Sequence, residues 1–346
     1  MSFLRPRRFS SNLVSASVVA TKAIDVTFPP DIVNRLRRWQ DAKKATLKLH
    51  ASPRIERIKV VYKGSPKPET DLSMAKGIST PFDCARHLSQ MLCDRSVIAL
   101  VNDIPFDMHR PLVADATLDF IHFKDIYHNP TAANLAFWRS CQFIMGAAVE
   151  SAFKEKFRMR LLSFHKTSLE SGSFVADFRM ELHSKNSLEE MVNWQPTERE
   201  LRSLSHVGQL IAANSQPFEC LDAKSQEIGN LLRDDNRLDR LNREADSGHI
   251  TIYRIGNYTQ ACAEAPLISN SSLIGRFSVV SLRLLGRLAP GHVRPNDSHH
   301  QLVYRAQGVS IPTAFLTHFT TFDVLRRRAK QPNPEVAGIP DYVEPV

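Results

Sequence analysis

The chain has 346 residues, about twice the usual length of one domain, so two domains with flanking segments are expected. Hydrophobic residues make up 42% of the sequence, which is enough for a sizeable core, and the longest apolar run has strand length, so no membrane partner is expected. The five cysteines form no CxxC pair and their number is odd, which argues against a disulfide framework and favours a reducing compartment.

Basic charge is concentrated near the N-terminus. The chain has 45 Lys and Arg against 36 Asp and Glu, a formal charge of +9. Residues 1–68 contain fifteen basic and four acidic side chains, whereas the remainder is almost neutral. This distribution is typical of a protein with one phosphate-contacting region, although an ordinary solvated helix face can be equally basic.

Residues 1–22 have the composition of a mitochondrial presequence. The segment has five serines and four basic residues, and no acidic residue precedes Asp25. Such segments are basic, rich in Ser and poor in carboxylates. We therefore predict a presequence here. The alternative is a basic tail without a targeting signal.

Residues 23–56 are predicted to form a basic arm. Pro30 and Asp31 favour the start of a helix, and an apolar stripe at helical spacing follows with Ile32, Val33, Leu36 and Trp39. We expect the basic residues of this arm to neutralise RNA phosphates without reading bases. The candidates are Arg35, Arg37, Arg38, Lys43, Lys44, Lys48, Arg54 and Arg57. A weaker candidate is the cluster Arg326, Arg327 and Arg328, which a basic last helical turn explains equally well.

Residues 57–125 are predicted to form a small β-grasp domain. A strand over 58–62 is followed by turn residues, and Thr80-Pro81 predicts the start of a helix. Two further strands are predicted over 96–101 and 118–123. One hairpin, one helix and two more strands in about seventy residues indicate a β-grasp fold.

Residues 129–330 are predicted to form a larger α+β domain. A long helix is expected after Pro130, and 174–182 alternates apolar and polar residues as a half-buried strand does. Further patterns predict a helix start at 196–198, strands at 250–254 and 277–285, and a final helix at 314–330. The tail 331–346 is rich in proline and is not expected to form a domain.

Both units resemble threonyl-tRNA synthetases. Residues 99–103, Asp107, 111–112 and 115–118 are similar to the TGS domain at the start of these enzymes. The order of elements over 129–330 is similar to their editing domain, so the resemblance covers about residues 58–330. It implies an α+β fold, in which a β-grasp TGS-like domain precedes an editing-like domain.

The residues that the resemblance assigns to editing are mostly missing. In that family, two histidines four apart on the long helix, with a later cysteine and histidine, bind metal or activate water. The matching helix positions here are Arg139 and Phe143, and the later loop keeps only Cys262. No phosphate-binding loop or nucleophile-elbow motif occurs. We therefore expect no enzyme activity, catalytic residue, metal or cofactor.

The combination also resembles the synthetase-derived proteins of the mitochondrial large ribosomal subunit. No segment of the 346 residues resembles the class II catalytic domain, so we expect no aminoacylation. The resemblance implies a scaffold role in the mitochondrial matrix, with large-subunit rRNA and neighbouring ribosomal proteins as partners and no small-molecule substrate. Alternatives are an RNA-binding regulator outside the ribosome and a free-standing tRNA-editing hydrolase.

Overall fold

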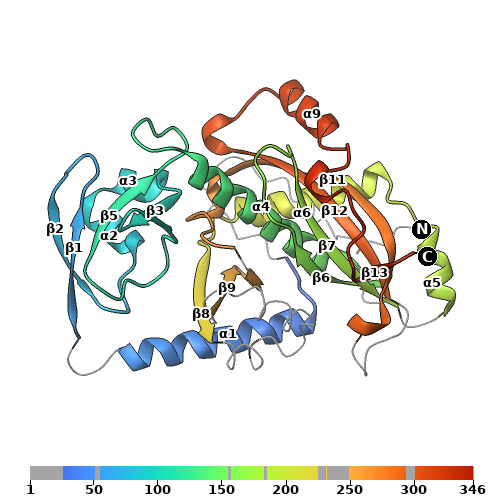
Figure 1. The fold of residues 1–346 in the computed structure, drawn as a ribbon, viewed down its shortest axis with the longest axis horizontal. Coiled ribbons are helices and arrows are strands. Elements are labelled where there is room, and N and C mark those ends of the chain that lie inside the picture. Colours follow the sequence, from blue (N-terminus) through green and yellow to red (C-terminus); the bar gives the residue numbers. More distant parts are fainter. Residues whose placement is uncertain are drawn as a thin grey trace, which may run out of the picture.

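The computed structural model divides into a small domain and a larger one, with helix α1 (Pro30–His50) along the lower side of the view in Figure 1. The structure describes residues 26–50, 55–154, 157–182, 185–224, 231, 249–262, 264–293 and 301–345. The expected presequence and Arg54 lie outside these residues. Among the described helices, none combines the length and apolar character that a membrane span requires.

The small domain has the β-grasp fold that the sequence predicts. Its elements are β1 (Arg57–Tyr62), β2 (Thr70–Ala75), α2 (Pro81–Leu88), α3 (Gln90–Arg95), β3 (Ile98–Val101), β4 (Ile104–Phe106) and β5 (Ala116–Ile121). The sheet order is β2-β1-β5-β3-β4, in which β1 and β5 run parallel. Helix α2 begins where Thr80 and Asp83 form a capping box, as the Thr-Pro pattern indicates.

The described residues of the larger domain form two sheets. One has the order β13-β11-β12-β7-β6 and the other β10-β9-β8. The strands are β6 (Arg158–Phe164), β7 (Phe174–Glu181), β8 (Glu219–Lys224), β9 (His249–Ile255), β10 (Tyr258–Cys262), β11 (Ile274–Leu288), β12 (Gln301–Pro312) and β13 (Val343–Glu344). In the part of the domain that the structure describes, the helices include α4 (Thr131–Ala152), α5 (Lys185–Val192), α6 (Glu198–Ala213) and α9 (Phe319–Arg328).

Helix α4 is the centre of this domain. From Ser140 to Ala152 every residue is buried, and most of these side chains are apolar or small. The two long polar side chains, Gln142 and Glu150, form hydrogen bonds with backbone groups of the neighbouring strands. Helix α6 begins at the Thr197 cap that the sequence predicts and packs on β11. A β-carbon at Gly208 would overlap the ring of Phe277, so this glycine permits the close approach of helix and sheet.

Strand β7 is buried on both faces, so the prediction of a half-buried strand was wrong. The reason is that polar partners cover its polar face. Asp177 accepts hydrogen bonds from Arg305 on the neighbouring strand and from Tyr342 in the tail. The tail also adds β13 to the edge of β11, where Leu288 pairs with Val343, and so belongs to this domain.

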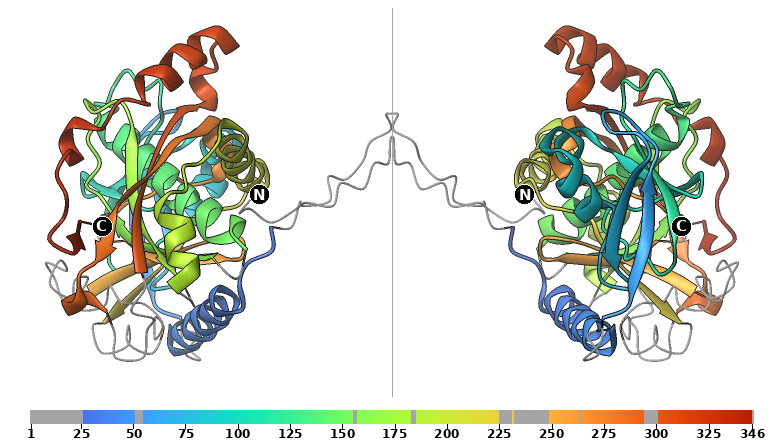
Figure 2. Two further views of the ribbon diagram at one scale, coloured as in Figure 1. Left: turned by 90° about the vertical axis from the view of Figure 1, so that its right-hand side faces the viewer. Right: turned by 90° about the vertical axis from the view of Figure 1, so that its left-hand side faces the viewer.

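Helix α1 packs against the three-stranded sheet through part of its predicted apolar stripe. Ile32, Leu36 and Trp39 are buried, but Val33 is 42% exposed and lies off the contact face. The Trp39 indole donates to the carbonyl of Ile252 at 3.3 Å. Figure 2 shows α1 at one end of the molecule and α9 at the other.

Candidate functional site

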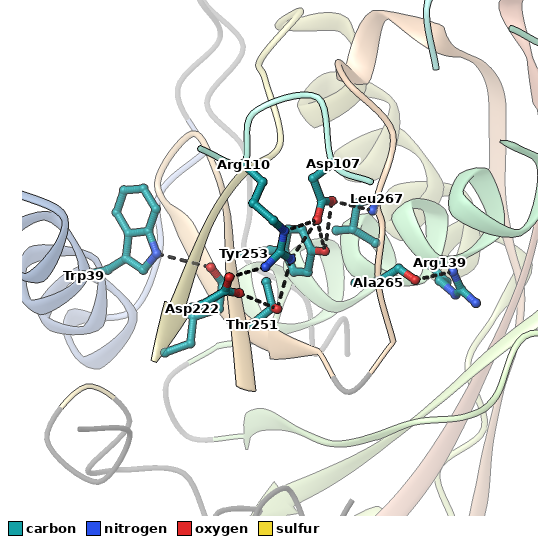
Figure 3. Close-up of polar contacts among 10 residues, drawn as sticks. Trp39, Asp107, Arg110, Arg139, Asp222, Thr251, Tyr253, Ala265 and Leu267 are labelled. Atoms are coloured by element: carbon teal, nitrogen blue, oxygen red, sulfur yellow. Dashed lines mark hydrogen bonds and ion pairs between the residues drawn. The ribbon is translucent and has the colours of Figure 1, made fainter. Parts of the chain in front are cut away.

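The region that corresponds to the synthetase editing site lies between α4 and the loop after β10. Arg139 of α4 donates through Nε to Glu264 at 3.1 Å. It also donates through Nη1 to the carbonyl of Ala265 at 2.9 Å (Figure 3). Glu264 also accepts a hydrogen bond from Thr167. The guanidinium is therefore held in an ion pair beside the loop that follows β10. Cys262 itself is the last residue of β10, because it pairs with Thr251 of β9, so the prediction that it lies in a loop was wrong.

The other positions are equally unsuited to hydrolysis. Phe143 is fully buried and packs in an aromatic cluster with Tyr253 and Tyr258. Cys262 is buried as well. A guanidinium stays protonated and a phenyl ring has no basic atom, so neither can activate water as an imidazole does. Within the described ranges, no group of three or more His, Cys, Asp or Glu could hold a metal ion.

The basic arm divides into an inward and an outward set, and the inward set consists of Arg35, Arg38 and Lys43. Arg35 is buried and donates to the carbonyl of Thr259 at 3.2 Å, and Arg38 donates to the carbonyl of Leu231 at 3.1 Å. Lys43 pairs with Glu219. Because these side chains contact the larger domain, they attach α1 to it. The number of charges in the sequence does not reveal which basic residues point inward.

Trp39 and Glu219 also help to hold α1 against the larger domain. The Trp39 ring lies 4.9 Å from Lys43 Nζ and 5.4 Å from the Arg254 guanidinium carbon, and Arg254 also pairs with Glu219 at 2.5 Å. Burial alone would raise the pKa of Glu219, but the contacts with Lys43 and Arg254 outweigh it and lower the pKa.

The outward set lies on one helical face. Arg37, Lys44 and Lys48 are exposed, at spacings of seven and four residues, with one acidic residue, Asp41, between them. Arg57, at the start of β1, is exposed and donates to the carbonyl of Ser73. Whether any of these residues contacts RNA stays a prediction.

The Arg326–Arg328 cluster occupies the last turn of α9, as the sequence indicates. Arg326 donates to Asp323 and to Ser278, and Arg327 pairs with Asp323. Arg328 is exposed. Two of the three arginines therefore already have an acidic partner on their own helix.

A polar network that sequence reasoning missed joins the two domains (Figure 3). Asp107 of the β-grasp domain accepts hydrogen bonds from the Tyr253 hydroxyl at 2.9 Å and the Leu267 amide at 2.9 Å. Arg110 pairs with Asp107 at 2.8 Å and also with Asp222. Burial and the nearby Asp107 raise the pKa of Tyr253 well above its usual value. Asp107 lies within the TGS pattern, but nothing in the sequence indicates Arg110 as its partner.

Comparison with known proteins identifies the family. A TGS domain model matches residues 59–122. Large ribosomal subunit protein mL39 of Drosophila melanogaster is 33% identical over 286 residues, which cover 81% of this chain and 79% of that protein. The chain belongs to the mL39 family. This assignment confirms the expected resemblance to synthetase-derived ribosomal proteins.

The mL39-family chain is also similar to enzymes. Mitochondrial threonine–tRNA ligase of Homo sapiens is 26% identical over 302 residues, which cover 85% of this chain and 37% of the ligase. Cytoplasmic threonine–tRNA ligase 1 of Homo sapiens is 28% identical over 185 residues, 22% of its length. This chain therefore matches little more than a third of the first ligase and less of the second, which confirms the expected resemblance to threonyl-tRNA synthetases.

Proposed function

We propose that this protein is a structural, non-catalytic component of the mitochondrial large ribosomal subunit. The match to Large ribosomal subunit protein mL39 along most of both chains supports the assembly. The rRNA and neighbouring proteins of that subunit are then its partners, and the mitochondrial matrix is its compartment. In this role the two domains provide surfaces that contact neighbouring molecules, and they catalyse no reaction.

The ion pair of Arg139 with Glu264 carries the non-catalytic part of the proposal. It occupies the place where the synthetase resemblance puts the first histidine of the water-activating set. Phe143 fills the second position with an apolar ring inside the core. Neither position therefore supplies an imidazole for metal binding or proton transfer beside Cys262.

The outward face of α1 is the proposed rRNA contact. Arg37, Lys44 and Lys48 project away from the larger domain, and each can neutralise a phosphate without reading a base. Arg57, at the start of the next element, extends the same candidate surface. Arg35, Arg38 and Lys43 contribute indirectly, because they fix the helix that presents the outward set.

The segment organisation is part of the same proposal. Residues 1–22 would direct import into mitochondria, and residues 23–56 would form the contact arm. Residues 57–125 and 129–330 would form the two synthetase-derived domains, with residues 331–346 closing the larger one.

Two measurements test this function. Absolute quantification by mass spectrometry of purified mitochondrial large subunits should find about one copy of this protein per particle, whereas a regulator outside the ribosome would be scarce there. A deacylation assay with seryl-tRNA(Thr) should show only the uncatalysed rate, with a threonyl-tRNA synthetase that carries the histidines as the positive control. Robust turnover by this protein would contradict the non-catalytic proposal.

A further inference from the structure

A groove opens where α1, the β-grasp domain and β8 meet. Its volume is about 780 Å³. Leu47 lines it from α1, and Phe82, Phe106 and Val113 line it from the β-grasp domain. Val113 is 64% exposed, although it is aliphatic. Neither Arg139 nor Cys262 lines this groove, so it is distinct from the editing-like region.

One wall of the groove is the edge of a sheet. Strand β8 ends the order β10-β9-β8, and among the described residues it pairs with β9 alone. The four consecutive residues from Glu219 to Asp222 all line the groove. Successive side chains of a strand point to opposite faces, so a consecutive run indicates that the edge itself borders the groove. An edge strand presents backbone N–H and C=O groups to which an extended peptide can add.

The charges of the groove cancel. Three basic residues, Lys43, Arg86 and Arg110, face three acidic residues, Asp83, Glu219 and Asp222. Each basic group has an acidic neighbour within this set, in the pairs Lys43–Glu219, Arg86–Asp83 and Arg110–Asp222. Two other titratable groups line the groove, and burial favours the neutral form of both: it lowers the pKa of His109 and raises the pKa of Cys220 well above its usual value. Among the described residues that line the groove, every cation therefore has an acidic partner, which disfavours a phosphate backbone as the occupant. An uncharged apolar segment loses little hydration free energy when it binds there.

We propose that this groove binds an extended, uncharged segment of a neighbouring protein of the large subunit. The segment adds as a strand to the outer edge of β8 and packs aliphatic side chains against Leu47, Phe82 and Val113. The six residues of β8 match a segment of similar length, about 20 Å of extended chain. This inference rests on the proposed function, which supplies the neighbouring protein.

Site-specific photocrosslinking in assembled subunits tests the proposal. Benzoylphenylalanine replaces Val113 in the full chain, and large subunits that contain it are purified and irradiated. The matched control places the same group at Ile104, which is 65% exposed in the same domain but does not line the groove. The expected result is a crosslink from position 113 to one short stretch of one ribosomal protein, mapped by mass spectrometry and absent from position 104.

A peptide of the mapped sequence then provides the quantitative test. It should bind the isolated full chain, and Val113→Asp should weaken binding about tenfold or more by placing a carboxylate against apolar side chains. Ile104→Asp should leave the affinity unchanged. Because both side chains are exposed, neither change threatens folding.

Each other outcome overturns the inference. Crosslinks from position 113 to rRNA, to the same chain or to a second copy would show that the groove has a different occupant. If position 113 gives no crosslink at all, the groove is empty in the assembled subunit. Equal effects of Val113→Asp and Ile104→Asp on peptide affinity would also contradict it. If the chain is missing from purified large subunits, the proposed function fails together with the groove, whereas a chain that is present without a protein crosslink contradicts the groove alone.

Discussion

The hydroxyl of Tyr253 donates a hydrogen bond to the carboxylate of Asp107 across the boundary between the two domains, with 2.9 Å between the oxygens. Both side chains are buried, and Arg110 and the Leu267 amide complete the coordination of the carboxylate. This arrangement fixes the β-grasp domain relative to the larger domain, so the protein can present both as one rigid surface.

Asp107→Asn is expected to destabilise the protein by about 1–3 kcal/mol, because Arg110 loses its buried carboxylate partner and keeps only the more exposed Asp222. Tyr253→Phe should cost about 1–2 kcal/mol, the value of one buried hydrogen bond. Urea unfolding of the full chain measures both. Asp103→Asn is the control, since Asp103 is exposed at φ 63°, a conformation that Asn tolerates. A change within about 0.5 kcal/mol for Asp107→Asn would contradict the importance of this joint.

Trp39→Ala is expected to loosen α1 and to cost about 3–5 kcal/mol, because a large buried side chain and its hydrogen bond to Ile252 are lost together. Hydrogen exchange of the α1 amides should accelerate in this variant. Leu49→Ala, on the same helix at 79% exposure, should have no effect. Unchanged exchange in the Trp39 variant would show that α1 does not depend on this contact.

Reversal of Arg37, Lys44 and Lys48 to Glu is expected to reduce incorporation into large subunits several-fold, because three phosphate contacts become repulsive. The control reverses Lys63, Lys67 and Arg199, which are also exposed but lie outside the arm. Cys262→Ala should also leave incorporation unchanged. The tagged variants are compared by their fraction in the large-subunit peak. Equal losses in both triple variants would mean that total charge, and not this helix face, determines assembly.

Acid should weaken the larger domain through Asp177. Burial alone would raise its pKa, but hydrogen bonds from Arg305 and His165 lower it to about 2. In the unfolded chain the pKa is near 3.8, so the stabilisation is complete above about pH 4 and is lost between about pH 4 and 2. The difference corresponds to about 2.5 kcal/mol.

Asp177→Asn removes this pH dependence and takes the carboxylate partner from the buried Arg305, at a cost of about 3–5 kcal/mol at neutral pH. Chemical unfolding at several pH values measures the stability of this variant and of the control Asp341→Asn, which changes an exposed carboxylate in the tail next to Tyr342. An acid response identical to that of the unaltered protein would exclude Asp177 as its source.

Local patterns in the sequence predict much of the fold. The Thr80 and Thr197 caps begin helices where expected, because their hydroxyls satisfy the first amides of each helix. Alternation in β7 correctly predicts a strand but not its burial. That burial depends on Arg305 and Tyr342, which lie more than a hundred residues away in the chain.

The candidate sites show the same limit. Substitution of the editing histidines by Arg139 and Phe143 is visible in the sequence, because the resemblance fixes the positions. The ion pair of Arg139 with Glu264 is not, since it joins residues 125 positions apart. Similarly, charge counts favour all the basic residues of α1, whereas packing decides that Arg35 points inward and Arg37 outward.

Sedimentation of a mitochondrial lysate through a sucrose gradient tests the central claim most directly. The account predicts that this protein migrates with the large ribosomal subunit, and that it shifts together with the large-subunit rRNA when low magnesium separates the subunits. A light peak at the size of the free chain, with none in the large-subunit fractions, would contradict it.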